Sequence, residues 1–191
     1  MNVYFFGGSF DPPHTAHKLI YKHCISLCDK FIFLPAACSP GKNKSVISRS
    51  HRIEMLKLLI DKDDITKVSI NDFETKNNDA QSYTVDTIDY LKSTLNENDS
   101  LYMILGSDQY NNLNNWKDYK SILNKINGII CFNRSGESIS SNSFLKKIEF
   151  NHNISSSFIR REIISNNIKN IKCMLDSKIY NYIINNDLYK N

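Results

Sequence analysis

The sequence predicts an α/β fold in which a Rossmann-like parallel sheet is flanked by helices, with a small helical C-terminal part. Two observations predict it: short apolar runs alternate with longer amphipathic segments, and these runs lack the polar alternation of a half-exposed strand. Strands separated by helices favour βαβ units, because parallel neighbours need a crossover connection. Ligands of such sheets bind beyond the carboxyl ends of the strands, so the residues that follow each strand are the candidates for function.

The expected elements follow one another in strand and helix order. The expected strands are residues 3–6, 31–34, 68–70, 101–105, 128–132 and 148–150. Apolar residues at helical spacing predict the first helix, at Ala16, Leu19, Ile20, His23, Cys24 and Leu27. Further helices are expected over 53–60, after a cap at 48–50, over 85–95 and over 116–123, with short helices in the tail. We expect a single domain, residues 1–191, with a helical C-terminal subregion at about 154–191.

The composition is that of a folded protein in a reducing compartment. Of the 191 residues, 41% are hydrophobic and 23% are charged, and the net charge is +4. Scattered lysines make nucleic acid an unexpected partner, and no apolar run reaches the roughly 18 residues that cross a membrane. Five cysteines without framework spacing, and an N-terminus unlike a signal peptide, predict reduced thiols and a cytoplasmic location. For Cys24 and Cys28 we favour packing over metal binding.

The segment after the first strand carries the most chemistry. It reads Gly7-Gly8-Ser9-Phe10-Asp11-Pro12-Pro13-His14-Thr15-Ala16-His17. Two glycines let a ligand approach the backbone closely, and two imidazoles three positions apart at a helix start can face one point. The free N–H groups of that helix end favour an anion, so the pattern predicts a phosphate site. In the alternative, one histidine caps the helix and the other packs; a zinc site is disfavoured because no third ligand is near in sequence.

A second segment offers a similar set of donors near the other end of the chain. Ile154, Ser155 and Ser156 lead into a probable helix start, and Arg160 follows one turn in. The alternative is an ordinary helix cap with surface arginines. The chain holds 24 asparagines and 19 lysines but only five arginines, a skew consistent with an A/T-rich coding background. Where lysine is so favoured, a retained arginine indicates a need for its planar fork, which favours a function for Arg160.

Taken together, the segments resemble those of the nicotinate/nicotinamide mononucleotide adenylyltransferases, in the nucleotidyltransferase superfamily. Residues 7–17 match that family's G-G-x-F-D-P-x-H-x-x-H, and residues 154–160 match its I-S-S-T-x-I-R except at Ser157. Further resemblances occur in order along the chain, at 35–42, 52–56, 82–87, 106–108, 116, 131–136 and 179–183. Two departures stand out: Ala16 replaces a usual glycine, and Gly41 precedes Lys42 where bacterial members often have histidine.

The resemblance implies that a mononucleotide's 5′-phosphate attacks the α-phosphorus of ATP, releasing pyrophosphate. It implies nicotinate mononucleotide as the preferred substrate, and nicotinamide mononucleotide as a weaker one. The implied catalytic residues are His14, His17 and Arg160. The implied ATP-binding residues are Gly7, Gly8, Ser9, Phe10, His14, His17, Gly106, Asp108, Ile154, Ser155, Ser156 and Arg160. The implied mononucleotide-binding residues are Ser9, Phe10, Lys42, Tyr83, Thr84, Trp116 and Arg134.

The resemblance also implies a separate role for several of these residues. His17 is expected at the α-phosphate, His14 at an adjacent phosphate, and Ser156 with Arg160 at the leaving pyrophosphate. Trp116 is expected to stack on the pyridine ring, the alternative being core packing. Mg²⁺ is expected to be carried by the ATP phosphates, without protein ligands. Adenylyl transfer to phosphopantetheine, cytidylyl transfer, and a nucleotide-binding regulator without turnover are the alternatives; a homo-oligomer stays open.

Overall fold

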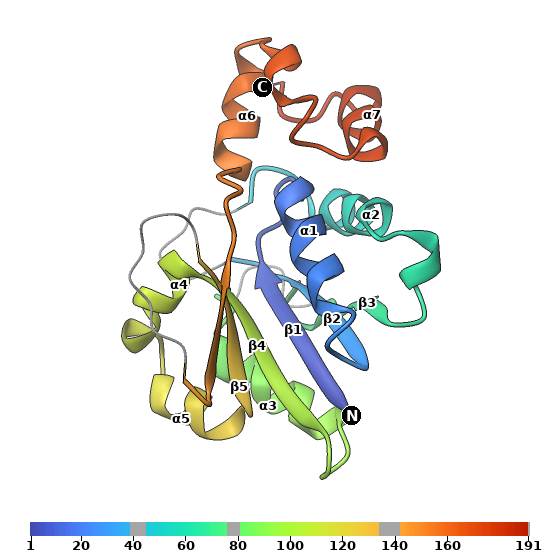
Figure 1. Ribbon diagram of the computed structural model, residues 1–191. Helices are drawn as coiled ribbons and strands as arrows, with labels where there is room; N and C mark the ends of the chain where they lie inside the picture. Colours follow the sequence, from blue (N-terminus) through green and yellow to red (C-terminus); the bar gives the residue numbers. More distant parts are fainter. Residues whose placement is uncertain (39–44, 76–80, 134–141, 191) are drawn as a thin grey trace.

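The computed structural model describes residues 1–38, 45–75, 81–133 and 142–190. Within them, six strands form one sheet in the order β3-β2-β1-β4-β5-β6, and every pair of neighbours is parallel (Figure 1). The strands are β1 (Asn2–Gly8), β2 (Lys30–Pro35), β3 (Val68–Ile70), β4 (Ser100–Gly106), β5 (Gly128–Asn133) and β6 (Leu145–Glu149). The predicted Rossmann-like parallel sheet is therefore confirmed, although the last strand begins earlier than expected.

Helices connect the strands and continue beyond the sheet. The α-helices are α1 (Thr15–Cys24), α2 (Arg49–Leu59), α3 (Thr84–Thr94), α4 (Ser107–Asn111), α5 (Tyr119–Lys125), α6 (Ser156–Ile164) and α7 (Ser177–Asn185). Short 3-10 turns are η1 (Lys62–Asp64), η2 (Phe73–Thr75), η3 (Leu113–Asn115) and η4 (Ile168–Ile171). A helix starting at Trp116 was the wrong expectation: the Trp116 amide closes η3 on Leu113, and Asp118 then takes a left-handed φ of 52° before α5 begins.

Both faces of the sheet are covered, because side chains of a strand point alternately to either face. In β1, Tyr4 and Phe6 join one apolar cluster, and Val3 and Phe5 join the other. The Tyr4 cluster takes in α1, α2 and the C-terminal helices, whereas the Val3 cluster takes in α3 and α5. Continuous apolar strands are what a sheet buried in this way requires.

Cys24 and Cys28 are buried in the first of these clusters, on the inner side of α1 and just after it. Burial raises the pKa of the Cys28 thiol to about 11, so this side chain stays protonated at neutral pH. The packing interpretation of the pair is confirmed. No group of three or more histidine, cysteine or acidic side chains that could hold a metal occurs in the residues that the structure describes.

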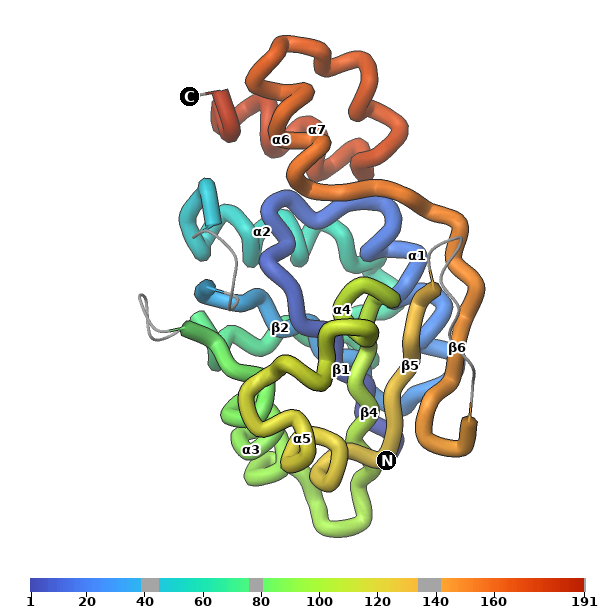
Figure 2. The backbone as a smooth tube through the Cα atoms, turned by 90° about the vertical axis from the view of Figure 1, so that its left-hand side faces the viewer, coloured from blue at the N-terminus to red at the C-terminus, as the bar shows by residue number. Residues whose placement is uncertain are grey.

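The C-terminal helices lie beyond the carboxyl ends of the strands, above α1 and α2 (Figure 2). Ile159, Ile163, Ile179 and Ile183 belong to the same apolar cluster as β1. Two polar contacts add to this packing: the Thr15 amide donates to the Met174 carbonyl at 2.9 Å, and 2.9 Å separates His51 Nδ1 from the Tyr182 hydroxyl oxygen. The C-terminal segment is thereby fixed to the start of α1 and to α2.

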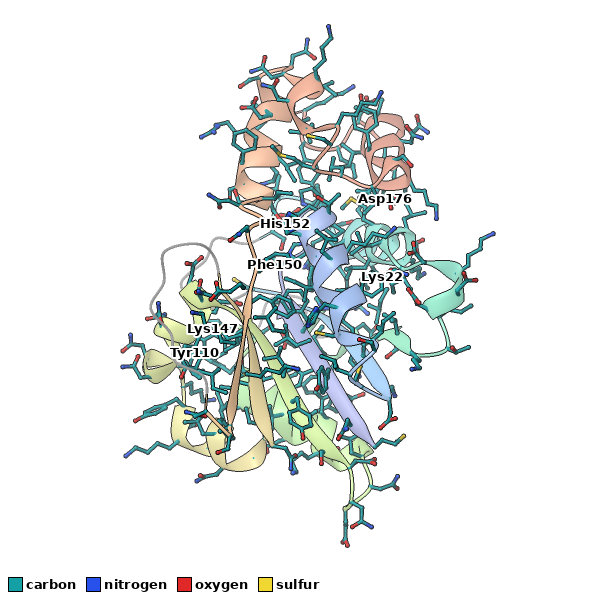
Figure 3. The ribbon with its side chains drawn as sticks, in the orientation of Figure 1. Lys22, Tyr110, Lys147, Phe150, His152 and Asp176 are labelled. Atoms are coloured by element: carbon teal, nitrogen blue, oxygen red, sulfur yellow. The ribbon has the colours of Figure 1, made fainter. Side chains whose placement is uncertain are left out.

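An ion cluster joins α1, η1 and the start of α7 on one side of the molecule, where Figure 3 labels Lys22 and Asp176. Lys18 Nζ lies 2.7 Å from Asp61 and 2.8 Å from Asp176. Lys22 Nζ lies 2.7 Å from the other Asp61 oxygen and 2.6 Å from Asp64. Hydrogen bonds from Lys18, which has the largest effect, and from Lys22 lower the pKa of Asp61 to about 2. The two ion pairs of Asp61 therefore stabilise the fold only while Asp61 is ionised.

This depressed pKa predicts an acid-sensitive contribution to stability. Asp61→Asn is expected to be about 1 kcal/mol less stable than the parent at pH 6, a value kept low because the site is partly exposed. The difference should be complete above the ordinary aspartate pKa of about 3.9 and should vanish as the pH falls toward about 2. Urea unfolding at pH values from 2 to 7 measures it, with exposed Asp63→Asn in the same turn as control. A difference that does not change with pH would contradict the assignment.

The part of the chain with described coordinates contains no helix that is both long and apolar enough to cross a membrane.

Candidate active site at the carboxyl ends of β1 and β4

The strand order reverses between β1 and β4, and this is where a sheet of this type opens for a ligand. β1 ends at Gly8, which is paired with Pro35, and β4 ends at Gly106, which is paired with Phe132. A Cβ atom built on Gly7 or on Gly106 would meet no atom within 4 Å. Two glycines on adjacent strands thus face open space, and a ligand can come close to the backbone there.

Gly8 has a different reason to be glycine. A Cβ atom there would lie 3.1 Å from the ring of Phe10, which folds back over it. Phe10 has a left-handed φ of 48° and is only 2% exposed, with its ring against those of Phe6, Phe33 and His17. The Phe10 ring is therefore a packing group, and its backbone is the part that can contact a ligand. The same ring supports one face of His17, at a centroid distance of 5.0 Å.

His14 and His17 come together at the start of α1. His14 is the N-cap, and its backbone N–H donates to His17 Nδ1 at 3.2 Å. The two rings stack with centroids 3.8 Å apart and planes 22° apart, which confirms that they face one side of the helix start. Because Nδ1 of His17 accepts this hydrogen bond, the neutral ring carries its proton on Nε2. His17 thus has a defined N–H donor, whereas His14 is nearly buried at 3% exposure.

The start of α6 lies against this loop. The Ser156 hydroxyl donates to the Pro12 carbonyl at 2.9 Å, and Arg160 Nη1 donates to the Asp11 carbonyl at 2.6 Å. Ser155 is an ordinary cap, since its hydroxyl accepts from the Phe158 amide at 3.2 Å. The structure therefore brings the two predicted segments, residues 7–17 and 154–160, into one site. The cap interpretation of the second segment is confirmed for Ser155, whereas Arg160 is directed to the Asp11 carbonyl, and the phosphate-binding interpretation stays a prediction.

A buried carboxylate and a buried guanidinium organise the loop from beneath. Asp11 is 2% exposed, and its two oxygens accept from the Tyr189 hydroxyl and the Val46 amide, each at 2.8 Å. Arg52 is 3% exposed, and its Nη1 donates to the carbonyls of Ser9 at 2.8 Å and Ala36 at 2.7 Å. Burial lowers the pKa of Arg52, and the nearby charge of Asp11 opposes that effect. These groups tie the loop after β1 to the loop after β2.

A second group of predicted residues gathers around the start of α3. Tyr83 is the N-cap of α3 and Thr84 its first residue. Lys117 Nζ lies 4.4 Å from the centroid of the Tyr83 ring and 3.7 Å from Asp86, so the segment after Trp116 contacts the start of α3. Trp116 itself is half-buried against the cluster of Val3 and Phe5, which agrees in part with its packing interpretation.

Glu74 lies behind the same helix start. It accepts from the Thr87 hydroxyl at 2.7 Å, and burial raises the pKa of its carboxyl group. The Ser82 hydroxyl accepts from the Ala37 amide at 3.1 Å, which joins the start of α3 to the loop after β2. The start of α3, with Tyr83 and Thr84, is thus joined to the loop that Arg52 supports.

The remaining predicted residues occupy different environments. Asp108 is exposed in the first turn of α4, next to fully buried Ser107, and so it borders the open space at Gly106. Ile154 is half-buried against the apolar cluster of Tyr4 and Phe6. Lys42 and Arg134 lie outside the residues that the structure describes.

Sequence reasoning did not assign roles to Arg52 or Tyr189. Arg52 carried a usable signal, being one of five arginines in a lysine-rich chain. Tyr189 carried none, because its partner Asp11 is 178 positions away.

Comparison with known proteins identifies the family. Residues 5–162 match the family model described as cytidylyltransferase-like. The chain is 36% identical over 197 residues to a probable nicotinate-nucleotide adenylyltransferase of Endomicrobium trichonymphae, covering 98% of each chain. It is 35% identical over 194 residues to one of Hydrogenobaculum sp. (strain Y04AAS1), covering 99% of this chain and 98% of the relative.

A solved structure shares the fold. It is a Plasmodium falciparum nicotinic acid mononucleotide adenylyltransferase complexed with NaAD, which superposes with a TM-score of 0.83 over 98% of this chain and 97% of its own, at 24% identity. That similarity shows the fold, whereas the family model and the two relatives show the family to which the chain belongs. The chain therefore belongs to the cytidylyltransferase-like family and, within it, to the nicotinate-nucleotide adenylyltransferases.

Proposed function

We propose that the protein transfers the adenylyl group of ATP to nicotinate mononucleotide, giving the dinucleotide and pyrophosphate. The observation that carries the proposal is the meeting of the His14 and His17 pair with Arg160 at the end of β1. The two imidazoles stack at the start of α1, Arg160 donates to the Asp11 carbonyl of the loop that precedes them, and Gly7 beside this loop faces open space. Phosphoryl-type transfer depends on positioning and on charge neutralisation more than on a protein nucleophile, and this set supplies both.

In the proposed reaction an oxygen of the mononucleotide's 5′-phosphate forms a bond to the α-phosphorus of ATP. The bond from that phosphorus to the bridging oxygen breaks, and pyrophosphate leaves with the electron pair. His17 donates from Nε2 to a nonbridging oxygen of the α-phosphate, where charge accumulates in the transition state. His14 stands beside an adjacent phosphate, stacked on His17 and held at the helix cap.

Arg160 and Ser156 are proposed to hold the leaving pyrophosphate. Arg160 uses one N–H on the Asp11 carbonyl and one on the Ser157 hydroxyl, at 2.6 and 3.3 Å. A guanidinium has five N–H donors, so others can meet phosphate oxygens. Gly106 and Asp108, at the end of β4, are proposed to lie along the nucleoside part of ATP. Mg²⁺ prefers oxygen ligands, whereas the proposed site offers imidazole and guanidinium N–H donors. Mg²⁺ would therefore be held by the ATP phosphates, whose charge it would neutralise.

The start of α3 supports nicotinate rather than nicotinamide as the pyridine substrate. Tyr83 and Thr84 lie at the N-terminus of an 11-residue helix, whose free amides favour a carboxylate. Lys117 adds a positive charge 4.4 Å from the Tyr83 ring. Trp116 is proposed to offer its exposed side to the pyridine ring, and Lys42 and Arg134 stay proposed contacts to the mononucleotide. The cytoplasmic location and a homo-oligomer stay predictions.

The proposal is tested by release of pyrophosphate from Mg-ATP with either pyridine mononucleotide. We expect turnover with both, and a kcat/KM about tenfold or more higher for the acid, since a charged hydrogen bond is worth about 1.5–3 kcal/mol. Controls replace ATP with CTP, or the mononucleotide with 4′-phosphopantetheine. Binding of ATP without turnover on either mononucleotide would overturn the proposal in favour of a nucleotide-binding regulator, and faster turnover of the amide would overturn the selectivity.

A further inference from the structure

We infer that Tyr189 is a positioning residue for the proposed adenylyl transfer, acting through Asp11 on Arg160. The inference rests on the proposed function, but it concerns a residue that touches none of the groups assigned to substrate. Tyr189 lies beyond α7, in the C-terminal segment, and its hydroxyl donates to Asp11 Oδ1 at 2.8 Å. Both side chains are buried, at 4% and 2% exposure.

Asp11 is a buried carboxylate, so each of its oxygens needs a donor. Oδ1 accepts from Tyr189, and Oδ2 accepts from the Val46 amide at 2.8 Å. Arg160 Nη1 is 4.0 Å from Oδ2, too far for a hydrogen bond, and it donates instead to the Asp11 carbonyl at 2.6 Å. The carboxylate and the guanidinium thus form a long ion pair without a direct hydrogen bond between them.

The phenol is a dependable donor in this position. Burial, and after it the negative charge of Asp11, raise the pKa of Tyr189 far above the ordinary value for tyrosine, so the O–H group stays protonated. The segment that carries Tyr189 is also rigidly attached. Asp187 and Tyr189 take left-handed φ values of 51° and 66°, which turn the chain back after α7, and Leu188 beside them is buried at 7% exposure.

These contacts give the hydroxyl a definite task. It donates a hydrogen bond to Asp11 Oδ1 without adding a charge, so the carboxylate is stabilised in its present position and does not move toward Arg160. Without the hydroxyl, Asp11 would keep one donor and would gain most by pairing directly with the guanidinium 4.0 Å away. That closer pair would draw the guanidinium toward Asp11 and take up at least one of the N–H donors that Arg160 is proposed to offer to the pyrophosphate part of ATP. The tail of the chain therefore preserves the phosphate-binding capacity of Arg160.

Tyr189→Phe tests this directly, since it removes one oxygen atom and keeps the buried ring. We expect the KM for ATP, and the Kd for ATP measured by calorimetry without mononucleotide, to rise about tenfold, the equivalent of one hydrogen bond to a charged group. The KM for the mononucleotide should stay within about twofold, because the Tyr189 hydroxyl acts on Asp11 in the loop after β1, whereas Tyr83 and Thr84 lie at the start of α3. All kinetics are measured well below the unfolding midpoint of each variant.

The matched control is Tyr182→Phe on α7, which removes a hydroxyl that contacts His51 rather than Asp11. It should lower the unfolding temperature but leave ATP binding unchanged. In an Arg160→Ala background, Tyr189→Phe should no longer change the affinity for ATP, because the residue through which it acts is gone. An unchanged ATP affinity in Tyr189→Phe, or an equal loss with and without Arg160, would overturn the inference. Failure of the proposed function would show differently, as ATP binding by the parent protein without turnover of either mononucleotide.

Discussion

His17→Ala is expected to lower kcat by at least about 10²-fold, the effect of removing one preorganised donor from a developing negative charge. The structure supplies the reason: the His14 amide donates to His17 Nδ1, so the ring must hold its proton on Nε2. The rings of Phe10 and His14 then fix its plane from two directions. A donor held in this way needs no reorganisation when charge develops on the α-phosphate.

Two comparison variants make the test specific. His17→Gln keeps an amide N–H of similar reach and should retain more activity than alanine. His23→Ala, an exposed histidine on the same helix, should keep kcat within about twofold, as expected for surface substitutions. Pyrophosphate release at saturating substrates gives kcat for each. A loss of tenfold or less in His17→Ala, with the fold intact by circular dichroism, would show that the ring serves packing at the helix cap rather than the reaction.

Arg52→Met is expected to destabilise the protein by about 3 kcal/mol, within the range for a buried charged group whose partners lose their donor. Met fills a similar volume, but it leaves the carbonyls of Ser9 and Ala36 without their shared donor. It also removes the positive charge that faces Asp11. Because those two carbonyls belong to the loops after β1 and β2, the loss should loosen the floor of the site as well as the fold.

Urea unfolding measures this effect, and Lys57→Met on the same helix is the control, since Lys57 is exposed and pairs with Glu54 at the surface. The control should change stability by about 0.5 kcal/mol or less. Arg52→Lys should fall between the two, because an ammonium keeps the charge but lacks the planar fork. An Arg52→Met protein as stable as the control would mean that the two loops hold together without the guanidinium.

Strands β1, β2, β4 and β5 were predictable from sequence because each contains a continuous apolar run that ends at a turn residue, whereas the start of β6 was missed because two lysines interrupt it. The order of the helices followed from their spacing. The two site segments were predictable because the residues within each lie within eleven positions of one another. What joins them was not: Ser156 meets Pro12 across 144 positions, and Tyr189 meets Asp11 across 178. Such contacts depend on how the C-terminal helices sit on the sheet, which local periodicity does not encode.

The scarcity of arginine in this chain indicated some, but not all, of what distinguishes its arginines. Arg52 and Arg160 both donate from Nη1 to backbone carbonyls of the loops that form the site. Arg161, which follows directly, is 69% exposed and lies over the Phe158 ring. Retention of arginine in a lysine-rich chain therefore indicated segments that form the site. Burial distinguishes the arginines that contact the site loops from the exposed Arg161.

The order of the strands also determines when, during synthesis, the central strand β1 can pair on both of its edges. β1 pairs with β2 on one side and with β4 on the other, and β4 begins only at Ser100. Until that point has left the ribosome, one edge of the central strand β1 has no partner, and an unpaired edge is a template for association between chains. The nascent protein is therefore most vulnerable while the ribosome translates the stretch between β3 and β4.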